Sequence, residues 1–532
     1  TRACGERMPG SGGKTIAVLG GGITGLTSAF TLSRSLPQDA YRIVLIESQS
    51  RLGGHVHSNR EPSTSALYEW GPRSIRPVGY RGLRTIELLH QLSLQDRMVL
   101  VPRSSASAQN RFLYHDGQLL RLPSSFWSAI QATLRQPILR RIFAEVRNEW
   151  HVSRSEHLGT AAGDESVHAF FNRRFGPCVA NTMASALMHG IYAGDSRELS
   201  IKAVMPSLVL TEQIHGSLLR ALLPRFLNSR YKASTYENSD QAKKEAIQSR
   251  LDPALVQKLS STSIYSFPQG LAELTRALEA ELLAMPHVSI WKGDACKRIV
   301  PRQRIEIETN HSKLHADRVV ATVPSIHLAP LLPDLPHLAY NPSAHLAIVD
   351  IVLGVGDILP IRGFGYLVPR NATNNSDEIL GVIFDSDAVP NQSQRLTKLT
   401  VMMGGPYWRH RTSFPDEDDV KERALRALHS QLGLSLLTLT SHLENISARV
   451  MTDTIPQYLV GHSQRMADLK AAITMHPQWR NRLSLLGYSY SGVGVNDCIA
   501  NAMDTCDAIS NYELNKPPLS DITGLQPAIF PG

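Results

Sequence analysis

The sequence predicts an α/β fold, because a short apolar run, a glycine-rich turn and a second apolar run follow one another near its start. Thr15–Leu19 has the composition of a buried strand, and Tyr41–Glu47 is a second such run. Between them, Gly20, Gly22 and Gly25 have the G-x-G-x-x-G spacing, and a helix-compatible stretch follows. A unit of this kind is typical of a Rossmann-type dinucleotide-binding domain.

Each part of this unit has a predicted role. Gly20 allows the tight turn, Gly22 lets the backbone approach a pyrophosphate, and Gly25 lets the helix pack on the strand. The helix start offers N–H groups and the positive end of its dipole to phosphates. Glu47, at the end of the second apolar run, can accept hydrogen bonds from a ribose and argues against the 2′-phosphate of NADP. The predicted contacts are Gly20, Gly21, Gly22, Ile23, Thr24, Gly25 and Glu47. The alternative is a chance glycine-rich turn.

An Arg-x-Gly-Gly stretch follows the acid and indicates which dinucleotide binds. Arg51, Gly54 and His55 lie just after Glu47, and an acid followed by R-x-G-G resembles the extension of FAD-dependent amine oxidases and their relatives. The glycines let backbone approach the cofactor, and a guanidinium can pair with phosphate or carboxylate. The alternative is a surface turn with a solvated arginine.

Length, charge and cysteine content limit the classes of protein to which the chain can belong. A chain of 532 residues predicts two or three domains, and 42% apolar with 19% charged residues is globular. The net charge of +8 suits a mitochondrial matrix-side or anionic-membrane protein, and no basic patch interleaved with aromatics predicts nucleic-acid binding. Five scattered cysteines without metal-ligand spacing predict free thiols and no metal site. No apolar run is long enough for a transmembrane helix.

Further motifs, taken in order, are specific to one family. They are Gly71–Pro77 (G-P-R-S-I-R-P), Gln109–Tyr114 (Q-N-R-F-L-Y), Asp164–Gly176, Gly190–Ser200, Gly363–Pro369, Ile455–His462 and Gly492–Ile499. With these segments the chain resembles the protoporphyrinogen oxidases, FAD enzymes of the penultimate step of haem synthesis, from about residue 14 to about residue 505.

The resemblance implies non-covalent FAD, a tetrapyrrole substrate and O2 as electron acceptor, with three H2O2 formed per six-electron oxidation. The flavin does the chemistry, so no acid or base residue is predicted. The implied substrate contacts are Arg111 and Arg73, then His189, Phe364, Leu367 and Met403. The implied further cofactor contacts are Gly71, Pro72, Arg73, Ser74, Ala295, Tyr488, Val493, Gly494 and Val495. The alternatives are a surface Arg111, a structural Arg73 bonding to backbone, a His189 without a role where some relatives have Arg, and ordinary core for the apolar residues.

The resemblance also implies three kinds of domain: a discontinuous FAD-binding domain, an α+β substrate-binding domain and a mostly helical membrane-binding domain. The FAD-binding domain is predicted at 14–105, with some substrate-domain segments, 263–325 and 455–514. The helical domain is predicted at 106–225, a polar insertion or linker that can be helical in part at 226–262, the substrate-binding domain at 326–454 and an irregular tail at 515–532. Predicted strands within these are Val288–Trp291, Arg304–Glu308, Asp317–Val323 and Leu483–Tyr488, and Gly492–Val495 opens a last helix.

Two stretches predict contact with a membrane surface. Phe126–Trp150 mixes aromatic and aliphatic residues with arginines, and Pro137 should break any helix there. Ala203–Leu227 is the second candidate, and the alternative for both is an ordinary packed helix. The family implies a peripheral position on the mitochondrial inner membrane, with a homodimer and hand-off to ferrochelatase as further predictions. The rival functions are an amine oxidase and a non-catalytic FAD or tetrapyrrole-binding protein.

Overall fold

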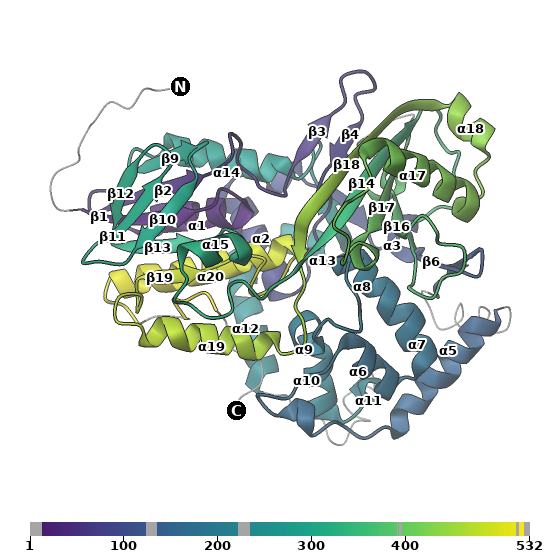
Figure 1. Cartoon of the computed structure of the whole chain (residues 1–532), viewed down its shortest axis with the longest axis horizontal. Coiled ribbons are helices and arrows are strands. Elements are labelled where there is room, and N and C mark those ends of the chain that lie inside the picture. Colours follow the sequence, from purple (N-terminus) through teal and green to yellow (C-terminus); the bar gives the residue numbers. More distant parts are fainter. Residues whose placement is uncertain are drawn as a thin grey trace.

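A five-stranded parallel sheet forms one half of the molecule (Figure 1). The computed structural model describes residues 13–123, 136–221, 235–390, 392, 396–517 and 521–525. The strand order is β19-β13-β1-β2-β9, and every neighbouring pair is parallel. The strands are β1 (Lys14–Leu19), β2 (Tyr41–Glu47), β9 (Val288–Lys292), β13 (Arg318–Ala321) and β19 (Leu483–Leu485). Three distant parts of the chain therefore build one sheet.

Both faces of this sheet are buried, as its continuous apolar strands require. Ile16 and Val18 of β1 belong to a core with three helices, whereas Ala17 and Leu19 belong to the core on the opposite face. The helices of the first core are α1 (Ile23–Ser35), α14 (Ala272–Ala284) and α20 (Val495–Glu513). The opposite face carries β10 (Cys296–Val300), β11 (Ile305–Thr309), β12 (Lys313–Ala316), α15 (Ser325–Leu328) and α19 (His462–Met475).

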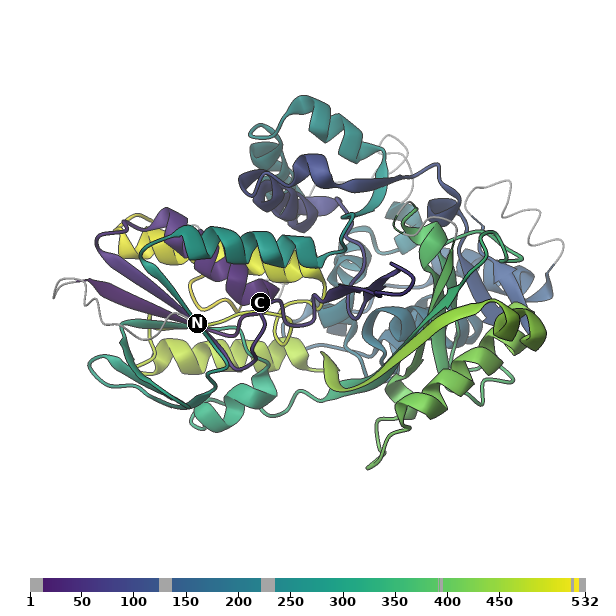
Figure 2. The same ribbon diagram turned by 90° about the horizontal axis from the view of Figure 1, so that it is seen from above.

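A seven-stranded sheet forms the second half, beside the first (Figure 2). Its order is β18-β14-β17-β16-β15-β6-β7. The strands are β6 (Phe112–His115), β7 (Gln118–Arg121), β14 (Ser343–Leu353), β15 (Gly365–Leu367), β16 (Ile379–Phe384), β17 (Thr397–Gly404) and β18 (Leu443–Pro456). Helix α17 (Glu417–Leu432) covers one face, because its Val420, Ala424 and Leu428 share a core with β14; α18 (Leu436–Ser441) follows it.

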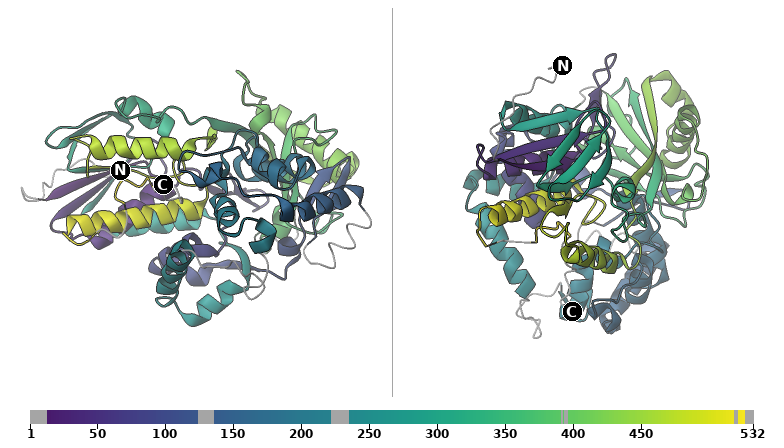
Figure 3. Two further views of the ribbon diagram at one scale, coloured as in Figure 1. Left: turned by 90° about the horizontal axis from the view of Figure 1, so that it is seen from below. Right: turned by 60° about the vertical axis from the view of Figure 1, so that its left-hand side comes forward.

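A group of helices lies below the second sheet in the view of Figure 1 and comes forward in the left view of Figure 3. It comprises α5 (Pro137–Asn148), α6 (Val167–Arg174), α7 (Pro177–Val179), α8 (Ser185–Tyr192), α9 (Ile201–Val204), α10 (Pro206–His215) and α11 (Leu218–Ala221). Arg174 pairs with Glu149 and Glu212, and all three are almost fully buried. Because removing one partner would leave a buried charge, this triad holds the helices together.

The mixed α/β class is confirmed, and most predicted strands form within two residues of their expected bounds. Helix α5 begins at Pro137, the first helical position, where proline is favoured. The last predicted strand is too long, since β19 ends at Leu485 and residues 486–494 form a turn without helix or strand. Residues 124–135, which include Phe126 and Trp127, lie outside the described residues, as do 222–227 at the end of the second candidate surface.

The start of the predicted helical domain, at residue 106, is wrong. After the short α3 (Ala106–Gln109), the chain forms the β6–β7 hairpin and joins the seven-stranded sheet. Asp116 and Gly117 both have positive φ, at 48° and 77°. An Asp-Gly pair between two short apolar runs is a strong hairpin signal that the helical interpretation overlooked.

The stretch predicted as a polar insertion is largely helical where it is described. It contains α12 (Thr235–Gln248) and α13 (Pro253–Ser260) and ends at β8 (Thr262–Ser266), which pairs with β5 (Val99–Pro102). Figure 2 shows these helices beside α2 (Gly79–Gln91). Ile247, Leu251 and Leu259 enter the core shared with α1 and α20. These few apolar residues anchor the segment despite its polar composition.

Candidate functional site

The glycine-rich turn brings β1 and α1 closer than any side chain would allow. Gly20 has φ +100°, and a Cβ added to Gly25 would overlap the Gly20 carbonyl oxygen. A Cβ on Gly21 would overlap Leu52. Gly22 differs, since its nearest neighbour would be the Gly54 Cα at 4.0 Å. Gly20 and Gly25 are therefore needed for the turn itself, and Gly21 makes room for the Leu52 side chain. Gly22 leaves space beside the helix start.

The N-terminus of α1 is free to bind an anion. Gly22 is the N-cap residue, and it supplies no capping side chain. No acidic residue lies in the first turn. The first N–H groups of the helix, from Ile23 and Thr24 onward, thus keep the positive end of the dipole available. This arrangement suits a phosphate.

Glu47 closes the glycine turn from the end of β2. Its carboxylate accepts hydrogen bonds from the N–H of Gly21 at 2.6 Å and of Gln49 at 2.7 Å. The next turn is tied to the same strand, because the Asp294 N–H donates to the Glu47 carbonyl at 3.0 Å and Ala295 follows it. Glu47, the predicted ribose acid, and Ala295, a further predicted cofactor contact, therefore lie close together. Glu47 also orders the turn, which the sequence did not indicate.

The Arg51–His55 stretch lies against the glycine turn. The Gly53 N–H donates to the Gly21 carbonyl at 2.8 Å, and Gly53 and Gly54 have φ of +105° and +56°. Arg51 donates to the Gly54 carbonyl at 2.7 Å. Burial and the nearby Arg449 lower the pKa of the Arg51 guanidinium, and Glu47 partly opposes this shift.

A second predicted segment passes beside His55. A Cβ on Gly71 would overlap the His55 carbonyl oxygen, so the 71–74 segment can approach only with glycine there. The His55 ring meets Tyr488 edge-on, with centroids 5.4 Å apart and 3.3 Å between Nε2 and Oη. The structure thus brings Arg51, His55, Gly71 and Tyr488 together from three distant parts of the sequence.

A buried tyrosine–histidine pair holds the turn before α20. The Tyr458 hydroxyl bonds the Tyr488 carbonyl and accepts the Gly492 N–H at 2.9 Å. Its ring stacks on His462, with centroids 4.2 Å apart. His462 Nε2 donates to the Tyr490 carbonyl at 2.9 Å, while Nδ1 faces the Tyr340 hydroxyl. Burial lowers the pKa of His462 to about 4, so the ring is neutral at pH 7. The sequence motif contained both residues but not this role.

The predicted Val493, Gly494 and Val495 form the start of α20. Asp497 accepts the Gly494 N–H at 3.0 Å and pairs with Arg81 at 2.6 Å. Asp497 is therefore an acid in the first turn that caps the helix N-terminus.

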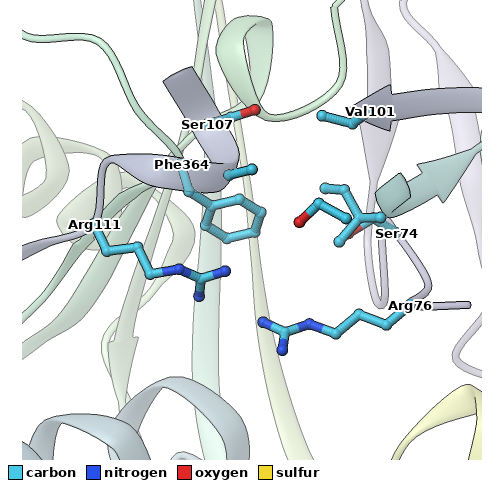
Figure 4. Close-up of a pocket in the computed structure, with 9 residues that line it drawn as sticks. Ser74, Arg76, Val101, Ser107, Arg111 and Phe364 are labelled. Carbon is cyan, nitrogen blue, oxygen red and sulfur yellow. The ribbon is translucent and has the colours of Figure 1, made fainter. Parts of the chain in front are cut away.

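One pocket lies between the Gly71–Pro77 segment and the start of β6 (Figure 4). Its volume is about 80 Å³. Arg111 lies 5.9 Å from the Phe364 ring centroid in a cation–π arrangement. Burial and Arg76 lower the pKa of Arg111. The lining residues are Ser74, Arg76, Val101, Ser107, Ala108, Arg111, Ser263, Ile264 and Phe364. The predicted pair Arg111 and Phe364 thus shares a pocket with Ser74, and Arg76 is a further lining residue that was not predicted. Both arginines are exposed, so Arg111 is at once a surface arginine and part of the pocket wall.

The remaining predicted substrate residues lie elsewhere. Arg73 is buried, 3.4 Å from Asp385, and donates to the Glu69 carbonyl, which favours the structural alternative. His189 is buried and Nδ1 donates to the Val368 carbonyl at 2.8 Å; burial lowers its pKa, so it supplies no positive charge. Leu367 is half-buried beside Gly190, and Met403 is fully buried in the core under α17. For Met403, ordinary core is the better description.

An arginine near Arg51, one of the predicted cofactor contacts, was not predicted from the sequence. Arg449 of β18 lies over the Trp70 ring at 4.2 Å and 3.2 Å from His57 Nδ1. Burial, then Arg51, Arg449 and Arg276 lower the pKa of His57 to about 4. Nothing near the acid motif in the sequence signals Arg449, because it lies in a distant part of the chain. Within the described residues no group of metal-ligating side chains is found.

Comparison with known proteins identifies the class. Residues 23–510 match the family of flavin containing amine oxidoreductases. The chain therefore belongs to that family, and FAD is its cofactor. The open α1 start, the glycine turn and Glu47 fit FAD, because they offer space for a pyrophosphate and an acceptor for a ribose.

Relatives narrow the class further. The chain is 33% identical to a protoporphyrinogen oxidase of Schizosaccharomyces pombe, covering 93% of this chain and 99% of that protein. It is 34% identical to the human protoporphyrinogen oxidase, covering 94% and 100%. A solved structure of a putative protoporphyrinogen oxidase from Exiguobacterium has the same fold, with TM-score 0.71, 23% identity and coverage of 94% and 100%. Within the family, the chain belongs with the protoporphyrinogen oxidases.

Proposed function

We propose that the chain oxidises protoporphyrinogen IX to protoporphyrin IX, with O2 as the electron acceptor. The observation that carries this proposal is the relation to protoporphyrinogen oxidases at 33–34% identity over almost the whole of both chains. The overall balance is the removal of six electrons and six protons from the substrate by three O2, which gives three H2O2. Bound FAD supplies the hydride acceptor for this chemistry.

The residues of the chain bind and orient the reactants. The glycine turn, Glu47 and the α1 start would hold the adenosine and phosphate groups, and the turn before α20 would meet the flavin end. Arg111 would grip a propionate carboxylate, with Phe364 beside the hydrocarbon. We assign no proton-transfer role to a side chain, because pyrrole N–H and meso C–H protons of the substrate can leave by tautomerisation.

We also propose peripheral attachment to the mitochondrial inner membrane through the helical group. Helix α5 exposes Phe143, and Trp150 follows it, with 48% and 36% of their surfaces accessible. Arg140, Arg141 and Arg147 lie on the same short helix and could meet anionic head groups. Among the described residues no helix is long and apolar enough to cross a bilayer. Flotation with cardiolipin-containing vesicles tests this, and absence of the protein from the vesicle fraction would contradict it. The homodimer and the ferrochelatase hand-off stay predictions.

The activity is tested with purified holoenzyme in air and chemically reduced protoporphyrinogen IX. Porphyrin fluorescence should rise well above autoxidation, and about three H2O2 should appear per porphyrin, as the balance above requires. Flavin-loaded protein that gives no rise would contradict the proposal. Parallel assays with primary and cyclic amines address the rival amine oxidase function, because turnover of an amine without porphyrinogen oxidation would favour it.

A further inference from the structure

The pocket of Figure 4 has a guanidinium on each of two sides. Arg111 enters from the chain just before β6, and Arg76 enters from the Gly71–Pro77 segment. The lining residues include no acidic side chain, and among the described residues neither guanidinium forms an ion pair with a carboxylate. Two like charges that face one pocket repel each other, and a nearby anion would relieve that repulsion.

Two buried arginines of the neighbouring elements are paired, whereas Arg76 and Arg111 are exposed at the mouth of the pocket. Arg73, in the same segment as Arg76, has Asp385 at 3.4 Å. Arg84 has Asp504 at 3.0 Å and Asp507 at 2.7 Å. The fold therefore provides carboxylates for arginines that it buries, whereas the two exposed arginines of the pocket are solvated and stay accessible to an anionic ligand.

The backbone of Arg76 is held in place by several elements. Ile75 exchanges two hydrogen bonds with Tyr265 of β8, at 2.9 and 2.8 Å. The Arg76 carbonyl accepts from the Asn496 side chain of α20 at 2.8 Å. Pro77 follows and restricts Arg76 to extended conformations. The side chain is thus aimed at the pocket by a fixed main chain rather than by a free loop.

We propose that Arg76 is a second carboxylate-binding residue, and that Arg76 and Arg111 together bind two carboxylates of one ligand. With the function proposed above, on which this inference rests, these are the two propionates of the tetrapyrrole. A cavity of about 80 Å³ is too small for a macrocycle and suits its carboxylate edge. Val101, Ile264 and Phe364 provide apolar contacts for the propionate methylenes, and each guanidinium can bind a carboxylate as a fork.

The test compares protoporphyrinogen IX with its dimethyl ester, in which both carboxylates are neutral. Arg76→Gln should raise KM for the diacid by about 10-fold or more, the effect of losing one charge-assisted contact, and leave kcat and the KM for the diester nearly unchanged. Arg76→Lys keeps the charge without the fork and should raise KM less. Arg121→Gln is the matched control, because this exposed arginine of β7 lies outside the pocket, and it should leave both substrates unaffected.

An equal rise of KM for diacid and diester in Arg76→Gln would overturn the proposal, since it would indicate a structural effect. An unchanged KM for the diacid would overturn it as well. If Arg76→Gln does not retain FAD, the same comparison is made with Arg76→Lys. If the unaltered enzyme oxidises neither compound, the proposed activity fails, and the Arg76 inference is decided by fluorescence titration with protoporphyrin IX and its dimethyl ester. The inference is supported if the diester binds the unaltered protein and Arg76→Gln with equal affinity, while the affinity for the diacid is lower in Arg76→Gln. Equal affinities of the two proteins for the diacid would overturn it.

Discussion

The two helix starts that the cofactor would meet are built on similar backbone but differ in charge. Gly22 before α1 and Gly494 before α20 are both extended N-cap residues, with φ of −72° and −76°. The α1 start carries no capping side chain and no acid. The α20 start is capped by Asp497, which also pairs with Arg81. One start is open and positive, and the other is already neutralised.

This difference separates a site for a charged group from a site for an uncharged one. A phosphate gains from an open helix dipole, whereas at α20 it would meet the Asp497 carboxylate. We therefore place the pyrophosphate at α1 and the neutral polar edge of the flavin, or the ribityl oxygens, at α20. Three sets of substitutions break or sharpen this contrast, from the largest expected effect to the smallest.

The largest effect is expected at the α1 start, where alanine substitutions of two glycines should each abolish FAD binding, but for different reasons. Gly25→Ala places a Cβ against the Gly20 carbonyl oxygen. It should lower the free energy of unfolding by about 1–3 kcal/mol, and the protein should also lose FAD. Gly22→Ala meets only the Gly54 Cα at 4.0 Å, so the apoprotein should stay folded while phosphate approach is blocked. Flavin absorbance per protein and thermal unfolding of the apoproteins distinguish the two. A Gly22→Ala protein with full FAD content would contradict the placement of the pyrophosphate.

An effect confined to acid pH is expected at the turn before α20, where it is absent at pH 7 and reaches about 3 kcal/mol only as the pH falls to 4. The folded pKa of His462, about 4, lies below its ordinary value of 6.5, so the folded protein binds fewer protons than the unfolded one. Stability is therefore full above pH 6.5 and is lost as the pH falls toward 4. His462→Gln should weaken this pH dependence in the heat-induced release of flavin, measured from pH 7 to pH 4. The exposed His410→Gln is the control. An unchanged slope in His462→Gln would assign the acid sensitivity to other groups.

The smallest effect is expected at the α20 cap itself. Asp497→Asn removes the charge near the dipole and the ion pair with Arg81, and should cost about 1 kcal/mol while FAD is retained. Asp416→Asn, at the cap of the distant α17, is the matched control, since Asp416 accepts from the Asp419 N–H at 2.8 Å. The two should lower the melting temperature similarly. Loss of flavin in Asp497→Asn alone would mean that the carboxylate contacts the cofactor and that the two helix starts are not so different.

The sequence was sufficient for features that depend on neighbouring residues. The glycine turn, the strands around it and the acid at Glu47 follow from local spacing and period, and the structure places them together. The partners of the turn before α20 could not be derived in this way, because Tyr458, His462 and Tyr488 acquire their roles only through contacts across the fold.

The pocket residues show the same limit. Arg111 was identified through a family motif, but the approach of Arg76 depends on pairing between Ile75 and Tyr265, which are far apart in the sequence. Arg73 and Met403 have the right chemistry for a ligand site, yet tertiary packing turns the first toward Asp385 and the second into a core. The hairpin at Asp116–Gly117 could have been predicted from the sequence, because an Asp-Gly pair between two short apolar runs is a local signal. The prediction of a helix there was wrong although the sequence held the necessary information.

The five-stranded sheet has a consequence for the growing chain on the ribosome. Strand β1 is made first, but its neighbour β13 is made only after more than half of the chain, and β19 and α20 come near the end. Helix α1, which carries the open phosphate-binding end, packs against α20. The glycine turn must therefore wait for α20 before its surroundings are complete, and such long-range pairing is slow. A nascent chain should consequently acquire FAD only after α20 has left the ribosome, which makes bound cofactor a marker of molecules whose two distant helices have met.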